Sequence, residues 1–199
     1  MASPRTAPPA VDLALVAVFA ALLAALSLTP QIPVGALGVP LTLQTLGVLL
    51  AGLVLGPWRG FLAVLLYLAV GLAGLPVFAG ATGGLAVFAK PSIGFLLSFP
   101  LAAAVAGAGA AFFLRRGARW QYLWLTLAGL IASFVVIYPL GILGMMVVGR
   151  LDLLTAVGYN LAFIPGDIAK AFAAAAIAIA VHKAFPALLA TARPALDVS

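Results

Sequence analysis

The sequence contains no cysteine and a single histidine, and charged residues make up 7% of its 199 positions. Without cysteine it forms no disulfide and no thiolate metal site. One histidine, His182, does not supply the usual zinc-ligand or nucleophile–base sets. Soluble domains carry about 25% charged residues, so this composition cannot cover a surface that faces water. A soluble globular fold is therefore excluded.

Motifs for nucleotides and nucleic acids are also missing. The sequence has no GxxxxGK[ST] segment, which excludes ATP binding through a P-loop. The net charge of +6 comes from basic residues scattered between apolar runs, and scattered charges do not form the basic groove that nucleic acid needs. We expect no nucleic-acid partner, no metal and no cofactor.

Long apolar segments dominate the chain, which is 66% hydrophobic with a mean hydropathy of +1.30. A membrane-spanning helix needs about 20 mostly apolar residues. The segments that fit are 11–28, 41–56, 60–76, 92–114, 121–148 and 158–184. The sequence thus predicts an all-α integral membrane protein with six transmembrane helices, five or seven being alternatives. The membrane domain spans residues 11–185, with a flexible cytoplasmic segment at 1–10 and a cytoplasmic tail at 186–199.

The basic residues indicate how this domain is oriented. With a cytoplasmic N-terminus, only Lys90 and Arg150 fall in outer loops. The basic residues in cytoplasmic segments are Arg5, Arg59, Arg115, Arg116, Arg119, Lys183 and Arg193. The positive-inside rule then places both termini in the cytoplasm. The first segment also resembles a signal peptide, but its length and the five spans left after cleavage favour a transmembrane helix.

Two outer loops are unusually apolar. Residues 29–40, TPQIPVGALGVP, carry no charge, and residues 76–91, PVFAGATGGLAVFAKP, are rich in glycine. Exposed loops are normally polar because water must satisfy the backbone. We therefore consider two interpretations: the loops fold back over the helix ends and line a cavity, or they are connectors at the lipid interface.

Two charges, Asp167 and Lys170, lie inside the last apolar segment. Their spacing of three residues places both on one face of a helix. A charge near the middle of a bilayer costs ~2.5–3.5 kcal/mol, so the pair should face the bundle interior or a water-filled cavity. The pair is either a structural ion pair or a pair of contacts for a polar solute.

Other polar residues fall at the same outer end of the predicted bundle. Thr42 and Gln44 begin the second helix, Lys90 ends the second outer loop, and Tyr138 interrupts the fifth helix beside Pro139. Their shared location makes them candidate binding residues. A Ser–Lys dyad for catalysis has no local motif, so we do not expect an enzyme. The formal candidates for that dyad are Ser92 or Ser98 with Lys90 or Lys170.

Small residues recur along the first helix. Ala17, Ala21 and Ala25 form a ladder at spacing four, and Ala10 and Ala14 form a neighbouring one. Such ladders let helix backbones approach closely. The alanine surface could pack within the bundle or against another membrane protein.

Several stretches resemble a known family. VPLTLQTLGVLLAGLVLGPWRGFLAVLLYLAVGLAGLPVFAGATGGLAVF, which runs from Val39 to Phe88, is similar to the biotin-specific substrate-binding (S) components of energy-coupling factor (ECF) transporters, the BioY family. The TLQT and GLPVFAG motifs are the specific part, and PGDIAK near the C-terminus also fits. The resemblance covers most of the chain.

The resemblance implies a six-helix component that captures biotin with high affinity from outside a prokaryotic cell membrane. Two ABC-type ATPases and a transmembrane coupling protein would supply the energy, so ATP would bind only to partner subunits. The coupling protein would dock on the alanine ladder of Ala17, Ala21 and Ala25. The alternatives are an S component for another vitamin and, in a different class, an intramembrane enzyme acting on a lipid.

The resemblance also implies roles for individual residues. Asp167 and Lys170 would hold the fused rings of biotin, and Phe78 would press against them. Gly80 stands where some members have an asparagine whose side-chain amide contacts biotin. Glycine has no side chain, so another residue would have to supply that contact. The candidates for this replacement are Gln44 and Thr82. Lys90 would reach the carboxylate of biotin or extend to lipid headgroups.

Overall fold

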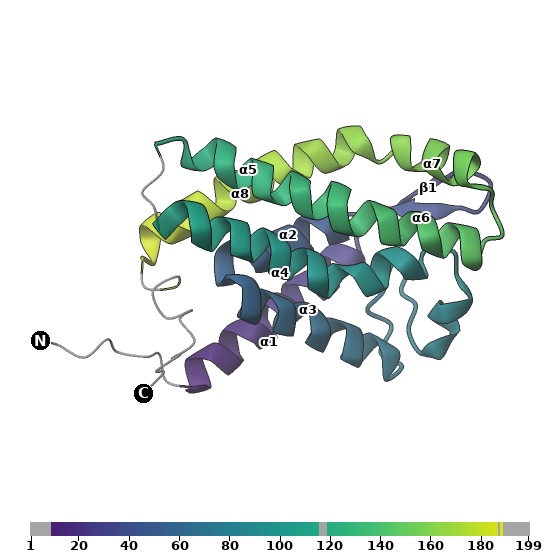
Figure 1. Cartoon of the computed structure of the whole chain (residues 1–199). Helices are drawn as coiled ribbons and strands as arrows, with labels where there is room; N and C mark the ends of the chain where they lie inside the picture. Colours follow the sequence, from purple (N-terminus) through teal and green to yellow (C-terminus); the bar gives the residue numbers. More distant parts are fainter. Residues whose placement is uncertain (1–8, 116–118, 187, 189–199) are drawn as a thin grey trace, which may run out of the picture.

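The computed structural model describes residues 9–115, 119–186 and 188, and most of the predicted end segments 1–10 and 186–199 lies outside them. The helices run side by side as an elongated bundle (Figure 1). They are α1 (Pro9–Ser27), α2 (Gln44–Leu55), α3 (Pro57–Leu72), the 3₁₀ turn η1 (Leu85–Ala89), α4 (Ile93–Arg115), α5 (Gln121–Ile131), the π-helical η2 (Ala132–Ile137), α6 (Tyr138–Val147), α7 (Leu153–Leu161) and α8 (Ile164–Ala184).

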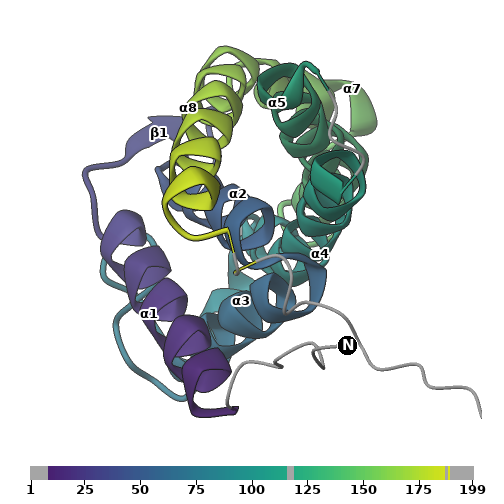
Figure 2. The same cartoon turned by 90° about the vertical axis from the view of Figure 1, so that its left-hand side faces the viewer.

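Helix α2 forms the centre of the bundle. Its sequence QTLGVLLAGLVL is apolar on every side, a pattern typical of a helix enclosed by others, and ten of its 12 residues are buried. Helices α1, α3, α4 and α8 pack around it (Figure 2). At 1.5 Å per residue α2 is about 18 Å long, which is shorter than the ~30 Å hydrocarbon core of a bilayer.

The turn between α2 and α3 leaves a backbone carbonyl that the single histidine, His182, satisfies. Gly56, with φ of 83°, ends α2, and Pro57 begins α3. In a helix the carbonyl of Leu53 would accept from the N–H of residue 57, but proline has none. Instead His182 of α8 donates from Nε2 to this carbonyl at 2.9 Å. The histidine thus satisfies a backbone group and joins α8 to α2.

The described helices match the predicted spans in part. Four are long and apolar enough to cross a membrane: Ala10–Ser27, Ile93–Arg115, Gln121–Val147 and Ile164–Ala184. Helices α2 and α3, which correspond to the predicted segments 41–56 and 60–76, are apolar but shorter. The six-span count therefore depends on counting these two short helices as spans.

The prediction of one helix over 158–184 is wrong. Helix α7 ends at Leu161 and α8 begins at Ile164, with Pro165 in its first turn. Proline is suited to the first turn of a helix, where its missing N–H has no partner to lose. The break places Asp167 in the first turn of α8, near the positive end of the helix dipole.

The predicted segment 121–148 is one continuous element despite Pro139. Between α5 and α6 the chain forms the π-helical segment η2, in which the N–H of Tyr138 bonds the carbonyl of Ser133, five residues earlier. Segments of this kind add a residue to a helical turn and rotate the side chains that follow. The helix thus accommodates Pro139 without breaking.

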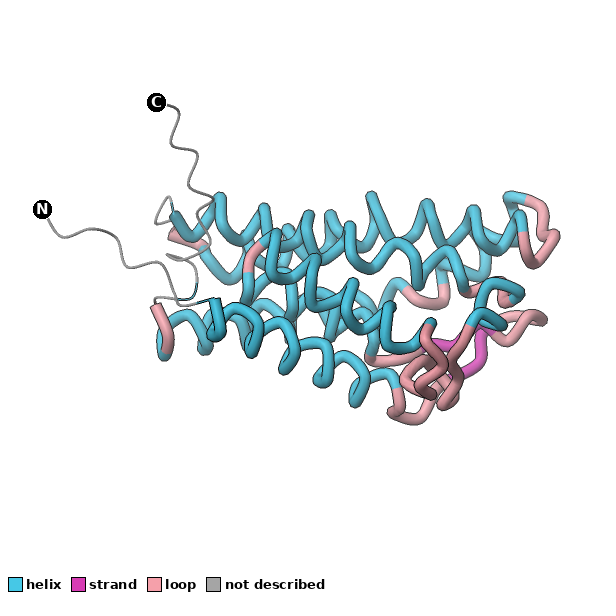
Figure 3. Tube along the Cα trace, turned by 90° about the horizontal axis from the view of Figure 1, so that it is seen from below, coloured by secondary structure: helices cyan, strands magenta, loops and turns pink. Residues whose placement is uncertain are grey.

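Loops 29–40 and 76–91, which keep the name outer loops from the predicted orientation, lie together at one end of the bundle (Figure 3). Strands β1 (Ile32–Val34) and β2 (Val39–Leu41) form an antiparallel hairpin, with Ile32 opposite Leu41. This small sheet was not predicted and is an addition to a fold that is otherwise mostly helical. The hydroxyl of Tyr159 in α7 accepts a hydrogen bond from the N–H of Ala36, at the tip of the hairpin, at 3.3 Å. In the second loop, backbone bonds pair Phe78 with Thr82.

Apart from Lys170 inside α8, the described basic residues lie toward the two ends of the bundle. Helix α1 begins and α8 ends at the end opposite the hairpin (Figure 1). Arg59 lies there and pairs with Asp12 of α1 at 2.7 Å, and Arg119 and Lys183 line one cleft there. Lys90 and Arg150 lie in the loops of the hairpin end. This distribution agrees with the charge pattern on which the orientation was predicted.

Close contact between α2 and α4 depends on Gly52. A Cβ at this position would lie 2.3 Å from the backbone oxygen of Ala103, which cannot rotate away. We predict that Gly52→Ala lowers the free energy of unfolding by about 1–3 kcal/mol, because the helices must separate. Unfolding of the purified protein in detergent measures this change.

Gly158→Ala is the matched control. Gly158 is exposed on α7, and a Cβ added there would have no other atom within 4 Å. Alanine at this position should leave stability unchanged or raise it by ~0.5–1 kcal/mol. If Gly52→Ala is as stable as Gly158→Ala, α2 and α4 do not approach as closely as described.

Candidate functional site

A cavity of about 400 Å³ lies beneath the two outer loops. Pockets for small molecules commonly measure about 300–1,000 Å³ and combine apolar walls with a few polar groups. Helices α2, α4 and α8 contribute the walls, and the loops contribute the cover. Its aromatic residues are Phe78, Phe95, Phe99 and Phe163, and its polar residues are Gln31, Thr42, Gln44, Thr45, Thr82, Lys90, Ser92, Asp167 and Lys170.

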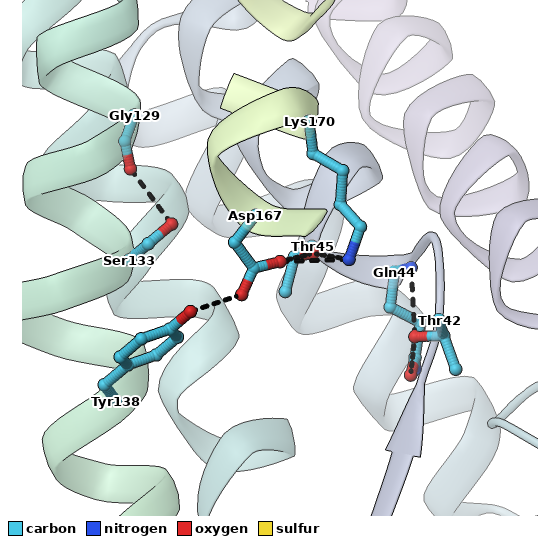
Figure 4. A network of polar contacts seen from close by, with 8 residues as sticks. All are labelled: Thr42, Gln44, Thr45, Gly129, Ser133, Tyr138, Asp167 and Lys170. Carbon is cyan, nitrogen blue, oxygen red and sulfur yellow. Dashed lines mark hydrogen bonds and ion pairs between the residues drawn. The ribbon is translucent and has the colours of Figure 1, made fainter. Parts of the chain in front are cut away.

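The charged pair lies in the wall of this cavity. Asp167 is 3% exposed and Lys170 is 9% exposed, and Lys170 Nζ lies 2.9 Å from Asp167 Oδ1. The hydroxyl of Thr45 in α2 accepts from Lys170 Nζ at 3.0 Å and donates to Asp167 Oδ1 at 2.9 Å. Figure 4 shows the three side chains converging from α2 and α8. The pair is therefore both an ion pair and part of the cavity wall.

Tyr138 supports the carboxylate from the other side. Its hydroxyl donates to Asp167 Oδ2 at 2.9 Å (Figure 4), and its side chain is not among those that line the cavity. Asp167 thus accepts bonds from Thr45, Lys170 and Tyr138 and also lies at a helix N-terminus. These partners supply the hydrogen bonds that a buried carboxylate needs.

Thr42 and Gln44 are held by a second set of contacts. Gln44 Nε2 donates to the Tyr67 hydroxyl at 2.7 Å, and Thr42 Oγ1 donates to Gln44 Oε1 at 3.1 Å. The Tyr67 hydroxyl in turn donates to the carbonyl of Val77 at 3.2 Å. Both ends of the Gln44 carboxamide are therefore engaged, and they join α2 and α3 to the second outer loop.

Phe78 packs deep under the second loop. It is 3% exposed, and its ring contacts Tyr67 edge-on with centroids 5.4 Å apart. A Cβ on Gly71 would lie 2.1 Å from the ring, so the glycine makes room for it. Phe78 still lines the cavity, as the resemblance implies.

The remaining predicted site residues lie at the cavity mouth. Thr82 Oγ1 donates to the carbonyl of Ala79 at 3.1 Å and accepts from Lys90 Nζ at 3.2 Å. Lys90 is exposed yet directed toward this loop. Gly80 also lines the cavity. The structure therefore brings together every predicted binding residue except Tyr138, which touches the cavity only through Asp167.

Sequence reasoning missed Thr45, Tyr67 and Gln31. Thr45 belongs to the TLQT motif and could have been found there, since it lies beside two predicted residues. Tyr67 stands in an apolar helix with no signal around it, and Gln31 stands in a loop. Ser98 donates to the carbonyl of Phe95, and within the described chain no hydrogen bond joins Ser92 or Ser98 to a lysine.

The alanine ladder lies on the outside of the bundle. Ala17, Ala21 and Ala25 are exposed on α1, whereas Val16 and Leu23 face the core. The ladder therefore does not pack within this chain. Its surface is available to lipid or to another membrane protein.

Comparison with known proteins identifies the family. The model of the BioY family matches residues 2–187. The chain belongs to the BioY family. The biotin transporter BioY of Rhizobium etli is 43% identical over 183 residues, which cover 91% of this chain and 98% of the relative. The biotin transporter BioY of Rhodobacter capsulatus is 42% identical over 188 residues, covering 89% and 96%.

A solved structure agrees with this assignment. The crystal structure of the S-component for biotin from an ECF-type ABC transporter matches with a TM-score of 0.82 and 30% identity. The match covers 88% of this chain and 92% of the other. The helical bundle described above is therefore the fold of an S component.

The ion pair makes a testable contribution to stability. We predict that Lys170→Met lowers the free energy of unfolding by about 3 kcal/mol, because it leaves the Asp167 carboxylate buried without its counter-charge. The double variant Asp167→Asn/Lys170→Met should recover part of this loss. Unfolding in detergent compares the two. A double variant less stable than the single one would contradict a mutual ion pair.

Proposed function

We propose that this protein is the biotin-binding S component of an ECF transporter and captures biotin with high affinity at the outer face of a prokaryotic cell membrane. The observation that carries the proposal is the cavity with Asp167 and Lys170 in its wall, in a chain of the BioY family. The protein acts in transport and not as an enzyme, in keeping with relatives that are named as transporters.

The hydrogen-bonding capacity of the pair suits a ureido group. A carboxylate accepts about four hydrogen bonds and an ammonium donates three. Asp167 accepts three from described residues, and Lys170 donates two. One acceptor site, on Asp167 Oδ2, and one donor, on Lys170 Nζ, thus remain. The ureido group of biotin offers an N–H for such an acceptor and a carbonyl for such a donor, and charge-assisted bonds of this kind fix orientation strongly.

The rest of the cavity suits the other parts of biotin. The phenylalanine side chains, Phe78 among them, would pack on the apolar fused rings. Lys90 at the mouth would attract the carboxylate. Thr42 and Gln44 would hold the walls in place rather than bind, since their polar atoms already bond each other and Tyr67. Closure of the two loops over the ligand would complete the site.

Transport would require partners. A coupling membrane protein would dock on Ala17, Ala21 and Ala25, and two ABC-type ATPases would supply the energy. Helices α2 and α3 would complete six spans, so that both termini lie in the cytoplasm with the basic end of the bundle. Biotin is the transported ligand, and ATP would bind only to the ATPases.

Equilibrium binding of labelled biotin to the purified protein in detergent tests the proposal. We expect about one biotin per chain, with no competition from thiamine or riboflavin. Competition by either vitamin would indicate an S component of different specificity. A folded protein that binds no biotin would overturn the assignment, and turnover of a lipid would indicate an enzyme instead.

The charged pair gives a sharper test. We predict that Asp167→Asn weakens biotin binding by about 1.5–3 kcal/mol, the contribution of a charge-assisted hydrogen bond. Asn160→Ala, a change to a buried polar residue that does not line the cavity, is the control and should leave affinity unchanged. If a folded Asp167→Asn variant binds normally, the pair is structural only.

A bulky side chain on the alanine ladder tests whether this surface docks the coupling protein. Ala21→Trp should prevent assembly with the coupling protein while biotin binding stays normal, because the indole keeps the two helices apart. Leu143→Trp, on the exposed face of α6, is the matched control. Co-purification of the tagged chain with its partners measures assembly. Normal assembly of the Ala21→Trp variant would exclude this ladder as the docking face.

A further inference from the structure

Gln31 lies at the cavity mouth with an unused polar group. It directly precedes strand β1 and lines the cavity. Within the described residues no hydrogen bond engages its carboxamide. The side chain comes from the first outer loop, between α1 and the hairpin, so it lies on a different segment from the residues of the second loop.

Gly80 of the second loop makes room for this carboxamide. A Cβ at Gly80 would lie 2.9 Å from Gln31 Nε2, closer than real side-chain contacts allow. Gly80 also has φ of 72°, in the left-handed region that favours glycine. The amide of the first loop thus occupies the space that a side chain at position 80 would fill.

The neighbouring uncharged polar groups already bond other residues. The Gln44 carboxamide bonds Tyr67 and Thr42, and the Thr82 hydroxyl bonds Ala79 and Lys90. Gln44 and Thr82 were the sequence-based candidates for supplying an amide or hydroxyl beside Gly80. Of these three side chains, only Gln31 makes no hydrogen bond within the described residues, and its Nε2 lies directly beside Gly80.

We infer that Gln31 is a ligand-contact residue whose carboxamide hydrogen-bonds a polar group of the bound ligand at the cavity mouth. The inference rests on the proposed biotin-binding function. Gly80 is the residue that permits this contact. Because Gln31 and Gly80 belong to different loops, the same contact holds the first loop against the second when ligand is present.

Binding measurements on single and double variants test whether Gln31 and Gly80 act through the same ligand contact. Gln31→Ala should weaken biotin binding about tenfold. Gly80→Ala should weaken it at least as much, because the methyl group displaces the flexible end of Gln31 and the left-handed φ of 72° adds backbone strain. The double variant should bind no more weakly than Gly80→Ala alone, since both changes remove the same contact. Gln121→Ala, at the opposite end of the bundle, should bind as the unchanged protein does.

Moving the amide to the other loop is a rescue test. Asparagine is among the residues that best tolerate the left-handed conformation. Gly80→Asn in the Gln31→Ala background should therefore restore affinity to within about threefold of the unchanged protein. If Gln31→Ala binds normally, or if the effects of the two alanine changes multiply, the inference is overturned.

A proximity measurement separates this inference from the proposed function. The chain has no cysteine, so Gln31→Cys/Gly80→Cys carries the only thiols, and a short bis-methanethiosulfonate reagent should link them. Linkage in the double-cysteine variant, together with no biotin binding by the unchanged protein, would leave the loop contact standing and refute the function. Failure to link in a biotin-binding protein would refute the contact alone.

Discussion

The ion pair between Asp167 and Lys170 is the constraint on which the rest of this bundle depends. Two charges inside an apolar helix must be enclosed and bonded, because unpaired charge in hydrocarbon is strongly unfavourable. The chain meets this need with partners on three helices: Thr45 on α2, Tyr138 on α6 and the start of α8 itself. Enclosing the pair also creates a polar point in the wall of an otherwise apolar cavity.

Irregularities in the helices place these partners. The break before α8 puts Asp167 in a first turn, the π-helical segment precedes Tyr138, and the short α2 begins at Gln44 beside the cavity. In each case a proline or a shortened helix takes the chain out of regular geometry near Asp167 or the cavity. Regular helices across the full length would leave no space there, so the irregular elements and the cavity arise together.

The outer loops are apolar because they serve as the cover of this cavity. Phe78 packs against Tyr67 under the second loop, and the hairpin of the first loop contacts Tyr159 of α7. Loops that bury apolar side chains against helix ends need fewer bonds to water than exposed loops do. The glycines at positions 71 and 80 give the Phe78 ring and the Gln31 amide their space. Cover and walls are thus packed as one unit.

The amino-acid sequence alone was enough to predict the membrane class, the helical bundle and the burial of Asp167 and Lys170 on one face of a helix, because hydropathy and charge are properties of composition and spacing. The folded structure was needed to show that α7 and α8 are separate helices, that residues 32–41 form a hairpin, and that Thr45, Tyr67 and Gln31 belong with the site. These features depend on contacts between segments far apart in the chain, such as Thr45 with Asp167. A sequence pattern does not give the distance between such segments in space. Only the packing of the helices and loops shows which of them are in contact.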